Sequence, residues 1–222
     1  MTNPLIVALD VPTLDDARAL AAKVAGVAGG LKVGMELYYA EGRAAVRALG
    51  GARIFLDLKL HDIPNTVAAA VRSLAPLGVD ILNVHALGGR AMMEAANEHK
   101  RDTTLIAVTI LTSLDDAALK DIGLPPADEA VPHLAALARD AGCDGVVCAP
   151  TDLAAVRAVC PPPFLIVTPG VRPSGSSRDD QARTMTPRQA IDAGADRIVV
   201  GRPVNAAPDP RAAAEAILED LR

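Results

Sequence analysis

The stretch FLDLKLHDIPNT, residues 55–66, places charged side chains inside an apolar run that is typical of a buried strand. Side chains alternate along a strand, so the leucines at 56, 58 and 60 should cover one face. Asp57 and Lys59 should then share the opposite face with Phe55. Burying such charges is unfavourable unless they pair with one another or act on a ligand. The stretch therefore predicts a strand that ends in a polar site.

Seven further short apolar runs, rich in β-branched residues, recur along the chain. They lie at 5–10, 30–35, 81–86, 105–111, 145–150, 164–170 and 197–203. Ala-rich stretches with helical periodicity separate most of them, as at 13–25 and 186–195. Both of these begin with a Thr that can cap a helix, and the second has Pro at the first helical position.

Strands and helices that alternate in this way predict parallel strands joined by helical crossovers. Eight such units in 222 residues match a compact (β/α)8 barrel, a TIM barrel, that forms a single domain over residues 1–222. An open doubly wound sheet is the alternative. The first strand–helix turn, ALDVPTLDD, lacks the glycine fingerprint of dinucleotide-binding sheets of that kind.

One connection, residues 170–187, is rich in Gly, Ser, Pro and charged residues and follows the seventh expected strand. Such a loop at the carboxyl end of a barrel strand is typical of a mobile lid, and an ordinary surface loop is the alternative.

Active sites of (β/α)8 barrels lie at the carboxyl ends of the strands. Polar residues or glycines fall there in six of the expected units: Asp10, Lys32, Asp57, Lys59, Asp62, Thr112, Ser113, Gly170, Arg172, Gly201 and Arg202. Charges that alternate at this end favour a catalytic cluster over buried ion pairs that only fix strand register. The glycines and arginines after the seventh and eighth strands can bind a phosphate group.

The composition excludes several other classes of function. The net charge is −5 and no Lys/Arg run occurs, so we expect no nucleic-acid partner. We expect neither a signal peptide nor a membrane-spanning segment. The spacing of the three cysteines and four histidines fits no metal site, and His85 is expected to be a hydrogen-bonded core residue. The odd number of cysteines and their spacing favour reduced thiols, and we therefore expect a cytoplasmic protein.

DLKLHDIPNT (57–66) resembles the signature block of the orotidine 5'-monophosphate decarboxylase family. The resemblance runs from about residue 5 to 210. The other motifs of that family occur in its order: ALD (8–10), LKVGMEL (31–37), VTILTS (108–113), VTPGVRP (167–173), DDQ (179–181) and VGRP (200–203). The resemblance implies a homodimeric barrel that converts orotidine 5'-monophosphate (OMP) to uridine 5'-monophosphate (UMP) and CO2, with no metal and no organic cofactor.

The resemblance also implies roles for single residues. Lys59 matches the proton donor, and Lys32, Asp57 and Asp62 match the rest of a charged array. Asp62, Ile63 and Thr66 match residues that reach the site of the partner subunit. The other implied substrate contacts are the ribose contacts Asp10 and Lys32, a pyrimidine contact at Thr112 or Ser113, the phosphate contacts Arg172, Gln181, Gly201 and Arg202, and the remaining block residues Leu58, Leu60, His61, Pro64 and Asn65.

Loss of CO2 from an sp2 ring carbon leaves a carbanion, and no cofactor motif offers an electron sink. Lys59 is then expected to stabilise that charge and to protonate it. Two alternatives stay open. One is a magnesium-dependent 3-keto-L-gulonate 6-phosphate decarboxylase or hexulose-phosphate synthase, which shares the Asp-x-Lys-x-x-Asp pattern. The other is a non-catalytic barrel that binds a phosphorylated ligand.

Overall fold

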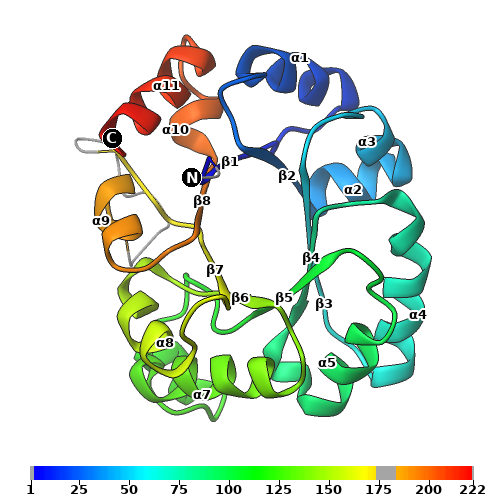
Figure 1. Cartoon of the computed structure of the whole chain (residues 1–222), viewed down its shortest axis with the longest axis vertical. Helices are drawn as coiled ribbons and strands as arrows, with labels where there is room; N and C mark the ends of the chain where they lie inside the picture. Colours follow the sequence, from blue (N-terminus) through cyan, green and yellow to red (C-terminus); the bar gives the residue numbers. More distant parts are fainter. Residues whose placement is uncertain (1–2, 174–183, 222) are drawn as a thin grey trace.

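The computed structural model describes residues 3–173 and 184–221, and within them eight parallel strands close into a barrel in sequential order (Figure 1). Each strand coincides with one of the apolar runs of the sequence, so the predicted (β/α)8 barrel is confirmed. The strands are β1 (Leu5–Ala8), β2 (Gly30–Gly34), β3 (Ile54–Leu60), β4 (Ile81–His85), β5 (Thr104–Val108), β6 (Gly145–Val147), β7 (Leu165–Thr168) and β8 (Arg197–Val200).

Helices surround the barrel and cover the outer faces of the strands (Figure 1). The α-helices are α1 (Leu14–Val24), α2 (Met35–Glu41), α3 (Arg43–Arg47), α4 (Pro64–Leu74), α5 (Arg90–Asn97), α6 (Asp116–Asp121), α7 (Ala127–Asp140), α8 (Leu153–Val159), α9 (Pro187–Asp192), α10 (Arg202–Asn205) and α11 (Pro210–Asp220). Short 3-10 turns occur at Ala75–Leu77, Ala86–Gly88 and Pro150–Asp152.

The predicted helix starts at two threonines are confirmed. The Thr13 side chain accepts the Asp16 backbone N–H at the start of α1. Thr186 and Gln189 form a reciprocal capping box at the start of α9, with Pro187 at the first helical position. Each cap satisfies backbone N–H groups that have no partner inside the helix.

Two apolar layers hold the barrel together. The inner layer is small and lies inside the barrel: Ile6, Ala8, Phe55, Ile106, Val167 and Val199. The larger outer layer packs the other strand faces, including Leu56 and Leu58, against the helices. Phe55 therefore points inward while its neighbour Leu56 points outward, as the alternation in the sequence predicts.

A repeated Gly-x-Asp pattern sets strand register at the amino end of the barrel. Asp80, Asp144 and Asp196 each precede a strand, and each carboxylate accepts a backbone N–H from the preceding strand in the barrel. The donors are Ile54, Leu105 and Ile166, at 2.8, 2.7 and 2.7 Å. These bonds stabilise the amino end of the barrel, which is opposite the carboxyl end where the site is expected.

The expected lid at 170–187 lies largely outside the described residues, as does the expected phosphate contact Gln181. On either side of that gap, Val171 forms a parallel bridge with Met185. The Arg172 backbone N–H donates to the Met185 carbonyl at 2.9 Å. No helix in the described part of the chain is long and apolar enough to cross a membrane.

Candidate active site

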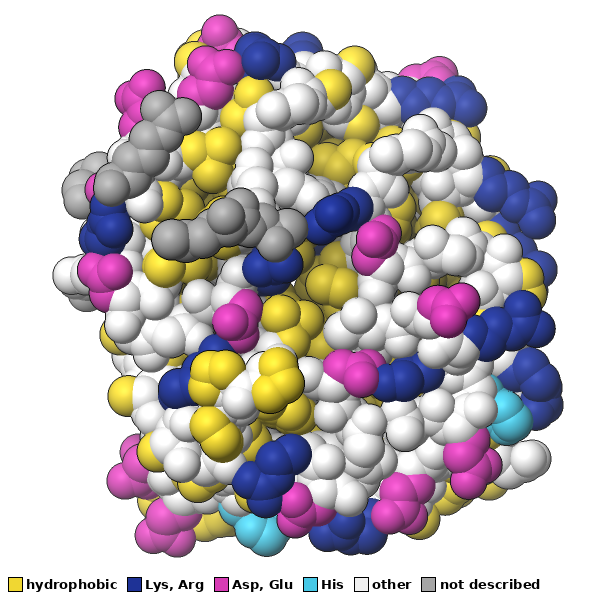
Figure 2. Space-filling model, viewed as in Figure 1, with side chains coloured by type: hydrophobic (Ala, Val, Ile, Leu, Met, Phe, Trp, Pro, Cys, Tyr) yellow, Lys and Arg dark blue, Asp and Glu magenta, His cyan; other side chains and the backbone are white. Residues whose placement is uncertain are grey.

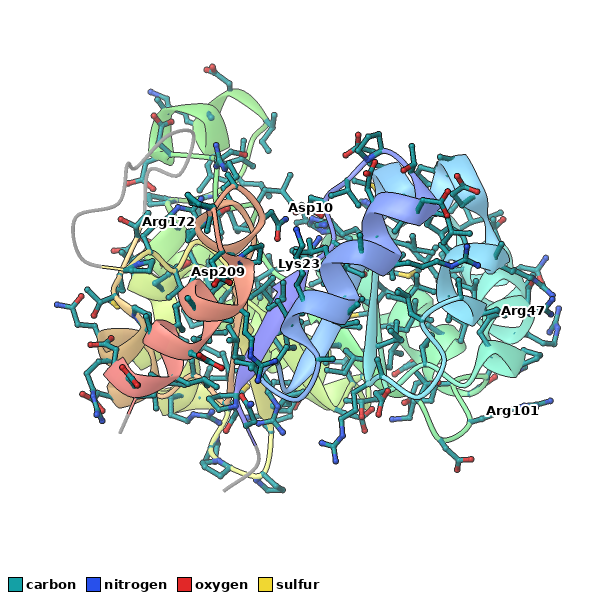
Figure 3. The ribbon with its side chains drawn as sticks, turned by 90° about the horizontal axis from the view of Figure 1, so that it is seen from above. Asp10, Lys23, Arg47, Arg101, Arg172 and Asp209 are labelled. Atoms are coloured by element: carbon teal, nitrogen blue, oxygen red, sulfur yellow. The ribbon has the colours of Figure 1, made fainter. Side chains whose placement is uncertain are left out.

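A cavity of about 640 Å³ opens at the carboxyl ends of the strands. Its lining residues come from the barrel interior and from the loops after β1, β5, β7 and β8: Ala8, Asp10, Val11, Lys32, Phe55, Asp57, Lys59, Thr112, Val147, Pro169, Gly170, Arg172, Val199, Gly201, Arg202, Asn205 and Ala206. Figure 2 shows basic and acidic side chains around a hollow at the centre of this face. In Figure 3, Asp10 and Arg172 lie toward this end of the barrel and Arg101 toward the other.

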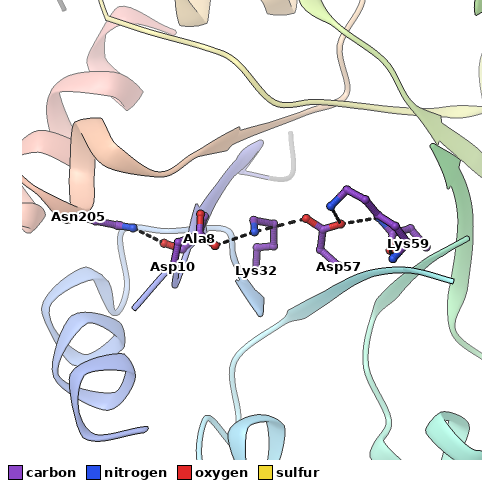
Figure 4. A network of polar contacts seen from close by, with 7 residues as sticks. Ala8, Asp10, Lys32, Asp57, Lys59 and Asn205 are labelled. Carbon is purple, nitrogen blue, oxygen red and sulfur yellow. Dashed lines mark hydrogen bonds and ion pairs between the residues drawn. The ribbon is translucent and has the colours of Figure 1, made fainter. Parts of the chain in front are cut away.

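Four charged side chains form an alternating row across the cavity (Figure 4). The Lys32 ammonium lies 2.9 Å from Asp10 Oδ1 and 3.4 Å from Asp57 Oδ2. The Lys59 ammonium lies 2.6 Å from Asp57 Oδ1. The row thus alternates in sign as Asp10, Lys32, Asp57 and Lys59, and each of the two inner charges has an opposite charge on both sides.

Burial and neighbouring charges act in opposite directions on the two inner residues, which are each only 9% exposed. Burial alone would lower the pKa of Lys32, but Asp57 and Asp10 outweigh it and raise that pKa above its ordinary value. Burial alone would raise the pKa of Asp57, but Lys32, Lys59 and the hydrogen bonds from Lys59 and Asn83 lower it. Lys32 is therefore cationic and Asp57 anionic at neutral pH.

Strand β3 departs from regular alternation where it enters the cavity. Leu56 pairs with Leu82 and Leu60 pairs with Val84, so residues 57–59 lie opposite the single residue Asn83. Lys59 has a φ of 51°, a left-handed conformation that is uncommon for a residue other than glycine. The expectation of an undisturbed strand is therefore wrong at Lys59: a bulge, and not simple alternation, brings its side chain into the cavity.

Two asparagines belong to the site although sequence reasoning did not select them. Asn83 is fully buried on β4; its Nδ2 donates to Asp57 Oδ1 at 2.7 Å, and its Oδ1 accepts the Lys59 backbone N–H at 2.8 Å. Asn205 lines the cavity from α10 and donates to the Ala8 carbonyl at 2.8 Å. For Asn83 the available signal was a single amide inside the apolar run ILNVHA.

The loops after β5, β7 and β8 bring further predicted residues to the cavity. Thr112 lines it, whereas the neighbouring Ser113 is exposed and does not. Gly170, with a φ of 75°, and Gly201 bring backbone close to the cavity. Arg172 and Arg202 follow these glycines on the chain and also line the cavity, as the sequence predicts.

The segment from His61 to Thr66 lies outside the cavity. All six residues are exposed, and the Asp62 carboxylate accepts the backbone N–H of Ile63 at 2.7 Å. Asp62 forms no ion pair with any residue in the two described ranges. Pro64, Asn65 and Thr66 form the first turn of α4. The chain on its own therefore unites Lys32, Asp57 and Lys59 but does not bring Asp62 to them.

The His61 and His85 rings stack beside the β3 bulge, with centroids 5.3 Å apart. His85 is buried and its Nδ1 accepts the Leu87 backbone N–H at 3.4 Å, which confirms the prediction of a hydrogen-bonded core histidine. Burial, followed by the charges of His61 and Lys59, lowers the pKa of His85 to about 4. His85 is therefore neutral near pH 7.

The fold and the cavity together define a (β/α)8-barrel enzyme whose site is a row of opposite charges at the carboxyl ends of the strands. Residues 3–217 match the model of the orotidine 5'-phosphate decarboxylase / HUMPS family. The chain belongs to this family, so the predicted membership is confirmed.

Relatives with curated names agree with the family match. The chain is 51% identical to orotidine 5'-phosphate decarboxylase of Moorella thermoacetica, over 99% of this chain and 92% of the relative. It is 55% identical to the protein of the same name from Anaeromyxobacter sp. strain K, over 96% of each chain. Neither name favours the magnesium-dependent alternatives.

Solved structures show the same architecture. The chain superposes on orotidine 5'-phosphate decarboxylase from Lactobacillus acidophilus with a TM-score of 0.88, at 38% identity and over 99% of each chain. For the protein of that name from Pyrococcus horikoshii OT3 the TM-score is 0.81, at 29% identity, over 98% of this chain and 99% of the other.

Proposed function

We propose that this chain decarboxylates orotidine 5'-phosphate to uridine 5'-phosphate and CO2, the last step of de novo pyrimidine synthesis. The observation that carries the proposal is the row of alternating charges from Asp10 to Lys59 in the barrel cavity, in a chain of this family. Curated relatives at about half identity or more, matched over nearly their full length, bear the name of this activity.

Lys59 stabilises the reaction's carbanion and then protonates it. Decarboxylation of the pyrimidine ring leaves a negative charge on an sp2 carbon, and a fixed ammonium next to that carbon lowers the barrier. The same ammonium can deliver a proton to the carbon once CO2 has left. Asp57 holds the Lys59 ammonium at 2.6 Å and Lys32 holds Asp57 in turn, so the charges are oriented before the substrate arrives.

The remaining cavity residues bind the parts of the nucleotide that do not react. Asp10 and Lys32 contact the ribose, and Thr112 contacts the pyrimidine. Arg172 and Arg202 bind the phosphate with the backbone around Gly170 and Gly201, because guanidinium groups match phosphate oxygens in pairs. In the expected scheme Gln181, outside the described residues, is a further phosphate contact.

The enzyme works as a homodimer in which Asp62, Ile63 and Thr66 reach the partner's site. The exposure of this segment supports the proposal: Ile63 is 66% exposed and Tyr39 on α2 is 71% exposed, so a partner subunit could cover both of these large apolar side chains. His61, Pro64 and Asn65 belong to the same exposed segment. The proposed location is the cytoplasm, where the three buried free thiols stay reduced.

The test is an absorbance assay of OMP consumption by the purified chain, with and without EDTA. Turnover that is insensitive to EDTA is expected. Among the described residues no group of three or more His, Cys, Asp and Glu side chains could hold a metal ion. Turnover that EDTA abolishes and magnesium restores would favour the metal-dependent sugar-phosphate enzymes. Nucleotide binding without turnover would favour a non-catalytic barrel.

A further inference from the structure

Asn83 occupies the place in the barrel where the β3–β4 ladder is interrupted. Residues 57–59 of β3 lie opposite Asn83 alone, so the ladder supplies fewer β4 backbone partners than β3 needs at this point. The Lys59 backbone N–H donates instead to the Asn83 side chain, at 2.8 Å to Oδ1. A side-chain amide therefore takes the role of the missing backbone acceptor, next to a lysine with a φ of 51°.

The other end of the same amide fixes the orientation of the Asp57 carboxylate. Asn83 Nδ2 donates to Asp57 Oδ1 at 2.7 Å, and the Lys59 ammonium donates to the same oxygen at 2.6 Å. Asp57 Oδ2 faces Lys32 at 3.4 Å. With Oδ1 held by the amide, the carboxylate cannot rotate without breaking a bond, so each oxygen stays directed at one lysine.

No other side chain of this size combines these two contacts without taking up a proton. An amide offers an acceptor and a donor on one rigid plane, whereas a carboxylate only accepts and an apolar isostere does neither. Asn83 is 0% exposed and is not among the residues that line the cavity. A buried amide with both ends bonded to one strand couples the backbone of Lys59 to the carboxylate that holds its ammonium.

We propose that Asn83 is a positioning residue for the reaction: it fixes the backbone of Lys59 and the carboxylate plane of Asp57, and it does not touch the substrate. The inference rests on the proposed decarboxylase function, since Lys59 and Asp57 are the groups it places. Misplacing reacting groups by about 1 Å can cost on the order of 100-fold in rate. Loss of Asn83 should therefore lower kcat more than it raises KM.

Two variants and one control test the proposal. Asn83→Leu removes both contacts while it keeps the branched shape of the side chain, and kcat should fall by about 100-fold. Thr103→Val is the control, because it removes one buried hydrogen bond, to the Val79 carbonyl, at the amino end of the barrel. Its thermal stability should fall but its kcat should stay within about threefold of wild type.

Asn83→Asp separates positioning from general stability. The new carboxyl oxygen would lie beside Asp57 Oδ1, and two carboxylates this close favour sharing one proton. With that proton the side chain can donate to Asp57 as the amide does; without it the two groups repel. The activity of Asn83→Asp relative to wild type should therefore fall as pH rises, whereas the loss in Asn83→Leu should not depend on pH.

A readout independent of turnover is hydrogen exchange at the Lys59 backbone N–H, which should speed up in Asn83→Leu but not in Thr103→Val. An Asn83→Leu enzyme with a kcat within threefold of wild type would overturn the proposal, as would an Asn83→Asp enzyme with the wild-type pH profile. If the wild-type chain itself does not turn over OMP, the proposed function fails. The exchange measurement then tests Asn83 on its own, and unchanged exchange at the Lys59 N–H in Asn83→Leu would refute its proposed role in holding that backbone.

Discussion

The Lys59 ammonium lies 2.6 Å from the carboxylate of Asp57, the residue two positions earlier on the same strand. In a regular strand the two side chains would stand side by side on one face. Here the left-handed backbone of Lys59, at a φ of 51°, turns the lysine within a bulge. The carboxylate thus orients the ammonium while the bulge directs both toward the open end of the barrel.

From this relationship we predict that Lys59→Ala abolishes turnover but keeps nucleotide binding. The variant lacks the group proposed to stabilise and protonate the carbanion, while the ribose and phosphate contacts remain. UMP binding, measured by calorimetry, should stay within about tenfold of wild type. Lys23→Ala, at an exposed position of α1, is the matched control and should keep full turnover. Turnover retained by Lys59→Ala would refute the assigned role.

A side chain at position 34 should lower activity, because it would lie against Lys32 and Asp10. A Cβ at this position would lie 3.0 Å from Lys32 Nζ and 3.1 Å from Asp10 Oδ1. The backbone φ of −89° suits alanine, and Lys32 can move its flexible end, so Gly34→Ala should fold with nearly wild-type stability. The displaced ammonium should nevertheless lower kcat/KM by at least about tenfold.

Parallel measurement of Tm and of steady-state kinetics checks this prediction. Gly50→Ala is the control, since its Cβ would meet only the Arg47 carbonyl, at 3.4 Å, away from the site. A large loss of Tm in Gly34→Ala would mean that the glycine serves the fold, and unchanged kinetics would mean that the position of Lys32 is not critical.

The sequence predicted the eight strands well because buried parallel strands are short apolar runs with clear breaks between them. It also predicted Lys32, Asp57 and Lys59 at one site, since parallel strands bring their carboxyl ends together. It did not predict the bulge at Lys59. That backbone conformation is imposed by tertiary contacts, and no glycine or turn residue marks it in the sequence.

Asn83 escaped sequence reasoning for a related reason. A lone amide in an apolar strand is compatible with many buried hydrogen bonds, and its partners are set by strand register, which the pattern of residues does not specify here. The choice between Thr112 and Ser113 likewise depended on the path of a loop. Structure alone places Thr112 against the cavity and Ser113 away from it.

Mixing two inactive variants should restore activity if Asp62 serves the partner's site. In a dimer of one Lys59→Ala subunit and one Asp62→Ala subunit, one site would hold both intact residues and the other neither. After equimolar mixing and random exchange, about a quarter of wild-type activity is expected. Each variant alone provides the control. No recovery, with exchange verified by differently tagged subunits, would place Asp62 in the site of its own subunit.

Arg202→Ala should lower kcat/KM for OMP by several orders of magnitude although Arg202 is remote from the reacting carbon in the proposed site. Binding energy from a non-reacting phosphate can be used to stabilise the transition state. The phosphate-free nucleoside orotidine provides the internal control, since its slower decarboxylation should be nearly unaffected. Arg18→Ala, which removes only an exposed pair with Asp15 at 3.3 Å, is the matched variant. A loss under tenfold for OMP would contradict the phosphate assignment.

His85 should make the fold less stable in mild acid. Its pKa is lowered from 6.5 to about 4, by burial and then by the neighbouring charges of His61 and Lys59. The unfolded chain therefore takes up a proton near pH 6.5 that the folded chain accepts only near pH 4. The stability from this residue is complete above pH 6.5 and is lost as pH falls toward 4, and linkage gives a loss of about 2 kcal/mol between pH 7.5 and pH 5.

His85→Asn isolates this contribution, because the Asn side-chain oxygen can accept the Leu87 backbone N–H in place of Nδ1 and does not titrate in this range. Urea unfolding of both proteins at pH 7.5 and pH 5 gives the comparison. The free energy of unfolding of wild type should fall by about 2 kcal/mol more than that of the variant over this interval. Equal losses in the two proteins would show that His85 is not kept neutral by the fold, and that the acid sensitivity arises from other groups.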